Sequence, residues 1–200
     1  MIKEFYVKIP HRARITAIFI VIILVVYFVF RFLTIDAKSV PDEFLMARQQ
    51  ASGIAEEVVS LSNQSTENLI KISQLDQERK YAEALGLVSQ EIERNRQARG
   101  KAINLSSQLE TMAKNIAGIS PASAGQVALQ AVSSETTLIS RLIIYNDYLN
   151  QLLGILHDKF EGTNNGNSIP ELISKINDEA RAINDLDKKF NDLIGEFDSF

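Results

Sequence analysis

The sequence has no cysteine, no tryptophan and only two histidines among its 200 residues. Without cysteine there is no disulfide bond, no thiolate nucleophile and no cysteine-based zinc site. The two histidines, His11 and His157, have no second metal ligand at a characteristic spacing. No glycine-rich phosphate loop or nucleophile elbow is present either. We therefore expect no enzymatic activity, no catalytic residue, no cofactor and no metal.

Positive charge is scarce in most of the chain. Residues 36–200 contain 16 lysines and arginines against 24 aspartates and glutamates, which is a net charge of −8. An acidic domain cannot bind nucleic acid by neutralising phosphates. It is also repelled by an anionic membrane surface. Nucleic acid is therefore excluded as a partner.

Long apolar runs are absent from the chain except in residues 15–35. Between Ile15 and Phe30 there is no charged residue. A helix over residues 15–35 is about 30 Å long, which matches the hydrocarbon core of a bilayer. The alternative is a cleaved signal peptide, but its apolar core is normally shorter, and Ile35 is a poor residue for the −3 position of a cleavage site. We predict an uncleaved signal anchor that contacts the bilayer through Ile15 to Ile35.

Basic residues are concentrated before this run. Lys3, Lys8, Arg12 and Arg14 precede it, whereas Arg31 and Lys38 are the basic residues that flank its far end. Short basic flanks stay in the cytoplasm. We predict a cytoplasmic tail at residues 1–14, a single transmembrane helix at 15–35, a linker at 36–41 and an extracytoplasmic domain at 42–200 in the cell membrane.

Prolines are rare and stand at the edges of four stretches with helical periodicity, at about residues 41–75, 77–117, 121–160 and 169–199. In the first stretch, apolar residues alternate by three and four, as in a coiled coil, with Ser65 and Asn68 as polar members. In the second, the three-four spacing is broken between Asn95 and Ala98, where a second interval of three follows the first. This change of spacing predicts a stammer. The third stretch has a wide apolar face, and Glu135 occupies one of the three-four positions along the centre of that face. A capping box at Ser168 begins the fourth.

Short connections make successive helices antiparallel. The predicted fold is therefore all-α: a transmembrane helix followed by an antiparallel up-down four-helix bundle with long helices. This order of an anchor and a tall bundle resembles the layout of the sensory module of bacterial chemoreceptors, although no second span follows.

Four charged residues are predicted to lie at a similar height in the bundle. Arg141 and Asp187 fall within apolar arcs of the third and fourth stretches. Counting residues in both directions from the turns places Arg99, and either Glu56 or Glu57, at about the same level. One interpretation is a structural ion network that fixes the helix register. The other is a pocket in which the two arginines hold a carboxylate-bearing ligand.

The sequence favours a scaffold or protein-interaction domain that binds a protein partner or a second copy of itself. The alternative is a ligand-sensing ectodomain that binds a small anionic ligand at the arginine layer and signals through a partner. A membrane-tethered hydrolase is a third possibility, but it requires a catalytic group that the sequence does not provide.

Overall fold

The computed structural model describes residues 39–163 and 168–200. Within the chain, Lys38–Phe200 forms a compact unit of its own. The predicted tail, the predicted span at residues 15–35 and the first residues of the linker lie outside the described residues.

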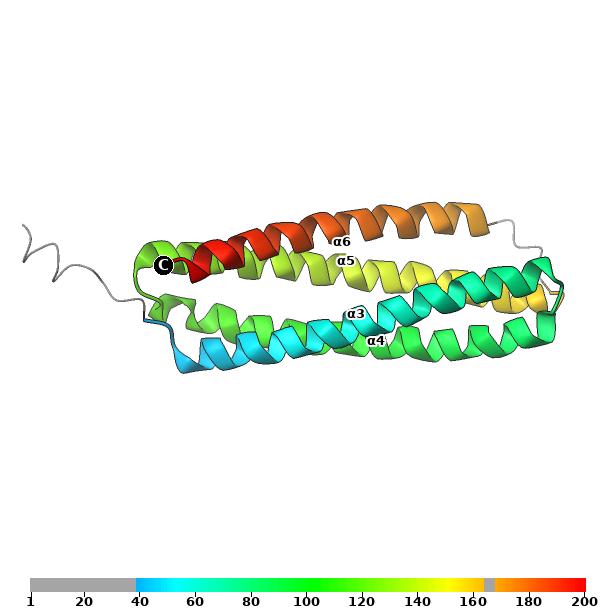
Figure 1. Ribbon diagram of the computed structural model, residues 1–200, viewed down its shortest axis with the longest axis horizontal. Coiled ribbons are helices and arrows are strands. Elements are labelled where there is room, and N and C mark those ends of the chain that lie inside the picture. Colours follow the sequence, from blue (N-terminus) through cyan, green and yellow to red (C-terminus); the bar gives the residue numbers. More distant parts are fainter. Residues whose placement is uncertain (1–38, 164–167) are drawn as a thin grey trace, which may run out of the picture. The chain divides into compact units, whose positions relative to one another are not determined.

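The described residues fold into four long α-helices and one short 3-10 helix. They are α3 (Asp42–Gln77), α4 (Tyr81–Asn115), η1 (Ile116–Gly118), α5 (Ala122–Phe160) and α6 (Ile169–Asp198). The long helices run side by side (Figure 1). The prediction of an all-helical bundle is confirmed for this part of the chain, and no strand is found in it. The helix limits differ from the sequence estimates by a few residues.

The helices pack unequally on one another. α3 packs along α4, α4 along α5, and α5 along α6, whereas α3 and α6 approach each other far less. The terminal end of the bundle, where α3 begins and α6 ends, contains a core cluster that includes Phe44, Leu109 and Phe197. The loop end, where α3 ends and α6 begins, contains a second cluster that includes Ile72 and Leu153.

The buried face of α4 shows that the predicted stammer is wrong. Its buried residues alternate strictly by four and three along the whole helix: Ala84, Val88, Glu91, Asn95, Ala98, Ala102, Leu105, Leu109 and Met112. The charged Glu91, rather than the apolar Ile92, occupies the buried position in this spacing. Charged residues are rarely buried, so the apolar pattern alone predicts a change of spacing that the helix does not have.

Two helices end in a left-handed residue. Gly162 follows α5 with a φ of 81°, a conformation that glycine adopts without steric cost. Arg79 follows α3 with a φ of 58°, and the Lys80 amide donates to the Leu75 carbonyl at 2.9 Å, as in a Schellman motif. At the start of α6, Ser168 is the N-cap residue as predicted, but its side chain makes no capping hydrogen bond.

Among the described helices, α5 alone is long and apolar enough to cross a membrane. Half of its most apolar stretch is buried inside the bundle. A core helix passes the same test, and α5 packs against both α4 and α6. The composition of α5 is therefore explained by its place in the core.

Candidate binding groove

The loose packing of α3 against α6 leaves a groove along the bundle, which we call the α3–α6 groove. It contains two cavities. The terminal cavity has a volume of about 430 Å³, and the loop-end cavity has a volume of about 340 Å³. Both volumes are within the range of small-molecule pockets.

The terminal cavity is lined by apolar side chains and by several charged ones, most of which are acidic. Leu109 and Met112 of α4 form part of the floor, and Val59 of α3 and Phe190 of α6 stand on opposite walls. The charged residues that line it are Arg48, Glu56, Glu135 and Asp187. Three carboxyl groups thus share the cavity with one guanidinium.

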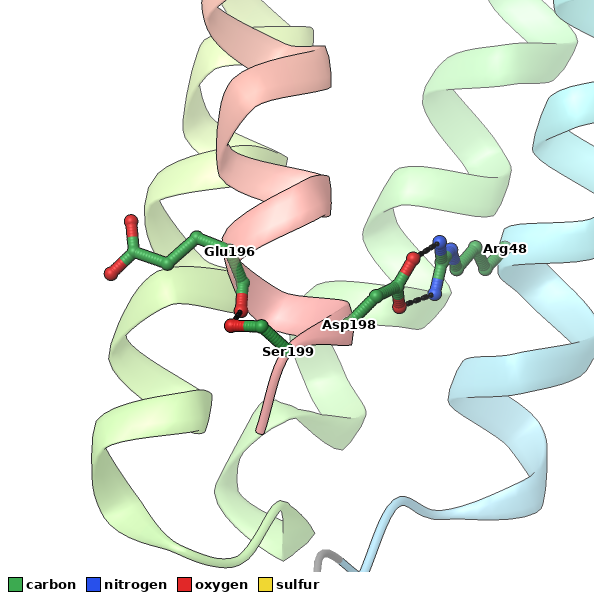
Figure 2. A network of polar contacts seen from close by, with 4 residues as sticks. All are labelled: Arg48, Glu196, Asp198 and Ser199. Carbon is green, nitrogen blue, oxygen red and sulfur yellow. Dashed lines mark hydrogen bonds and ion pairs between the residues drawn. The ribbon is translucent and has the colours of Figure 1, made fainter.

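The Arg48 guanidinium is bound by the carboxylate of Asp198 at the terminal end of the groove. Arg48 donates two hydrogen bonds of 2.7 Å to the two carboxylate oxygens of Asp198 (Figure 2). These hydrogen bonds raise the pKa of Arg48 above its usual value. Beside them, the rings of Phe44 and Phe197 have centroids 5.7 Å apart, and the Arg48 guanidinium lies 5.8 Å from the Phe197 ring centroid. These contacts join α3 to α6 at the terminal end.

Glu135 is the buried acid of the terminal cavity. It lies on α5 with 7% of its surface exposed. Its Oε2 atom has no hydrogen-bond partner among the described residues. Burial first, and then the charge of Asp187, raise the pKa of Glu135 from 4.5 to about 7. A buried carboxylate without a partner is costly, so this group holds a proton more firmly when the chain is folded.

The variant Glu135→Gln is expected to be more stable than the wild type at alkaline pH. Because the folded pKa is above the unfolded value, the wild-type side chain contributes stability below pH 4.5 and loses it as the pH rises through 7. The free energy of unfolding of Glu135→Gln should therefore exceed that of the wild type by a margin that grows to about 3 kcal/mol near pH 8. Urea denaturation followed by circular dichroism at several pH values measures this margin, and a constant difference from pH 4.5 to 8 would contradict it.

The loop-end cavity is also lined mainly by apolar side chains. Leu69 and Ile72 of α3, Leu152 of α5 and Ile173 of α6 are among its lining residues. Ile173 is 45% exposed, and Val59 in the terminal cavity is 59% exposed. Apolar surface is therefore accessible to solvent in both halves of the groove.

The net charge of the described domain is concentrated beside this groove. α3 and α6 together contain 14 acidic and six basic residues, a net charge of −8. α4 and α5 contain seven acidic and seven basic residues, so their charges cancel. The groove is therefore bordered by the two acidic helices, while the opposite side of the bundle is electrically balanced.

The four residues of the predicted charged layer do not come together. Glu57 pairs with Lys101, and Arg99 pairs with Asp147 at 3.2 Å. The Arg141 guanidinium lies 3.2 Å from Glu179 rather than beside Asp187. Asp187 accepts a hydrogen bond of 3.2 Å from Asn191.

Arg141, Arg99 and Glu57 are all exposed in these pairs. Counting residues from the turns estimates the height of a residue along the bundle. It does not show in which direction the side chain of that residue leaves the helix. The arginines therefore form separate surface ion pairs, and the arrangement offers no common pocket for an anion. Asp187 belongs instead to the terminal cavity, together with Glu135.

The buried polar cluster that the structure contains lies on α4. Glu91 is 1% exposed and accepts a hydrogen bond of 2.6 Å from Asn68 of α3. Arg94 forms an ion pair with Glu91 from the next turn. Close by along α4, Asn95 donates a hydrogen bond of 2.8 Å to the carbonyl of Asn146. The uninterrupted spacing of the α4 stripe is the sequence signal that identifies Glu91 as buried.

One group of possible metal ligands gathers at the loop end. His157, Asp158 and Glu161 at the end of α5 have ligand atoms within 4.8 Å of one another. The histidine Nδ1 lies 3.8 Å from Asp158 and 3.7 Å from Glu161. Both carboxylates are exposed, which is common for acidic groups that hold no ion. The spacing follows from neighbouring positions on one helix.

The comparisons with known proteins add no assignment to this geometry. Searches with protein-family models, among curated proteins and among solved structures found no match to the chain.

Proposed function

We propose that this chain is a single-pass membrane protein whose helical bundle acts outside the cytoplasm as a scaffold or protein-interaction domain. The apolar run from Ile15 to Ile35 supports the anchor, since its length as a helix suits a bilayer. The basic tail from Lys3 to Arg14 supports a cytoplasmic N-terminus. In this proposal the bundle presents a binding surface to a partner held at the same membrane.

The proposed occupant of the α3–α6 groove is an amphipathic helix of a partner protein, with basic residues on both sides of its apolar face. An apolar groove between two helices is a common receptor for such a helix. The observation that carries the proposal is the concentration of the net charge of −8 on α3 and α6, the two helices that border the groove. Acidic borders attract a basic partner and repel acidic ones.

Site-specific photo-crosslinking in native membranes tests this proposal. A photoreactive residue is placed in the full-length chain at Val59 or at Ile173, on the walls of the groove. The control position is Ile103 on α4, whose exposed fraction of 55% matches the 59% of Val59. We expect crosslinks from both groove positions and none from the control.

The crosslinked segment must also have the predicted chemistry. Mass spectrometry should identify a segment of another protein with an apolar helical stripe and flanking lysines or arginines. The double variant Glu56→Gln and Asp187→Asn should reduce the yield, because it removes two of the charges that face the partner. Crosslinks to a second copy of this chain, equal yields from Ile103, or an acidic segment would contradict the proposal.

A further inference from the structure

The terminal cavity has a feature that a surface for a partner helix does not require. Glu135 lines it from α5 at its buried side, and the Oε2 atom of this residue has no hydrogen-bond partner among the described residues. Buried polar groups in proteins are normally satisfied by a protein group, a water molecule or a ligand. The cavity of about 430 Å³ is large enough for a small organic molecule.

The charges around Glu135 select the sign of such a molecule. Asp187 of α6 and Glu56 of α3 line the same cavity, and α4 contributes only apolar side chains to it. Arg48 of α3 is the one cation in the lining, and both carboxylate oxygens of Asp198 accept its hydrogen bonds. A positively charged group is therefore attracted to the cavity, and an anion is repelled.

The walls select the rest of the molecule. Leu109, Met112, Phe190 and Ile194 present apolar surface to the cavity. A hydrated metal ion would gain little from these side chains, whereas a hydrocarbon or aromatic group gains free energy by leaving water. An organic ammonium donates hydrogen bonds to a carboxylate, and such charge-assisted bonds are stronger than neutral ones.

We propose that the terminal cavity binds a small organic amine, whose ammonium group contacts Glu135 and Asp187 and whose apolar body lies against Met112 and Phe190. This inference goes beyond the interaction function proposed above and does not depend on it. The ammonium supplies the hydrogen-bond donor that Glu135 lacks and offsets the repulsion between the two carboxylates.

Benzylamine is a suitable probe because it joins a primary ammonium to one aromatic ring. Benzyl alcohol is its neutral counterpart, and benzoate is its anionic counterpart. The protein is used as the full chain in lipid nanodiscs, with its methionines labelled by carbon-13 at the methyl group. Met112 lies in the cavity lining, and Met46 of α3 is 54% exposed and lies outside that lining. The two methyl signals therefore serve as reporter and control.

Benzylamine is expected to shift the Met112 signal in a saturable manner and to leave the Met46 signal unchanged. At about 10 mM, a ligand with a dissociation constant of about 1 mM nearly saturates its site. Benzyl alcohol should bind at least about tenfold more weakly, because it lacks the charge that strengthens a hydrogen bond. Benzoate should not bind.

Variants separate a specific site from a general apolar cavity. Glu135→Gln should weaken benzylamine binding by about tenfold or more, because it removes the charged acceptor. Asp187→Asn should weaken it less, and Asp192→Asn, an exposed position of α6 outside the lining, should leave it unchanged. The wild type should bind about tenfold more tightly at pH 8 than at pH 6, because Glu135 loses its proton near pH 7.

Four results would overturn the inference. They are no shift of Met112 at the highest benzylamine concentration, equal binding of benzyl alcohol, preferred binding of benzoate, and unchanged affinity in Glu135→Gln. The methyl spectrum of each variant shows at the same time whether it is folded. Loss of the crosslinks described above would leave this result unaffected, so the two proposals fail separately.

Discussion

Replacing Phe197 by alanine should lower the free energy of unfolding by about 3–5 kcal/mol. Phe197 is 1% exposed and packs against Phe44 and beneath the Arg48 guanidinium. The truncation removes the apolar contact that joins the end of α6 to the start of α3. Because α3 and α6 have few other close contacts, neighbouring helices cannot fill the space.

The same helix end provides a matched control. Phe200 lies three residues later and is 45% exposed. Phe200→Ala should change the free energy of unfolding by less than about 0.5 kcal/mol. Urea denaturation of both variants measures the difference, and equal effects would show that Phe197 does not hold the terminal end together.

Replacing Glu91 by alanine is expected to be similarly costly, at about 3–5 kcal/mol, because it leaves part of a buried ion pair without its counterion. Glu91 is 1% exposed, and its partner Arg94 is 20% exposed at the side chain. Asn68 of α3 also loses its acceptor. The double variant Glu91→Leu and Arg94→Leu should recover much of the loss, since it removes both charges together.

Glu93→Ala is the control for this prediction. Glu93 lies two residues away on α4, where it is exposed and pairs with Arg96 at 3.2 Å. Exposed pairs of this kind contribute about 0–1 kcal/mol. If Glu91→Ala were no more destabilising than Glu93→Ala in the same denaturation measurement, the buried role of Glu91 would be refuted.

The helices could be predicted from the sequence because apolar residues recur by three and four over many turns. Their exact ends were harder to predict where no glycine marks them. Gly162 signals the end of α5, whereas Arg79 adopts the left-handed conformation after α3 without such a signal. The loop hydrogen bonds, rather than the residue type, stabilise Arg79 in that conformation.

The candidate site could be predicted only in part. Glu135 was recognisable as a member of the α5 stripe, and its burial follows from that position. The groove was not predictable, because the apolar residues of α6 recur by three and four along the whole helix, as they do in a fully packed helix. Residues such as Leu186 and Phe190 continue this stripe, yet they remain half-buried since α3 does not close over them. Periodicity identifies the apolar face of a helix, but it does not specify how closely the facing helix approaches.

The chain contains no cysteine, so a single introduced cysteine reports on one position without background. Alkylation rates of Val59→Cys and Ile103→Cys, measured in the purified protein and in native membranes, test most directly whether a partner occupies the α3–α6 groove. The two sites have similar exposed fractions, 59% and 55%. The account predicts similar rates for both in the purified protein. In native membranes the groove position should react about tenfold more slowly than the control if nine-tenths of the grooves are occupied, whereas equal rates for both positions in native membranes would contradict the account.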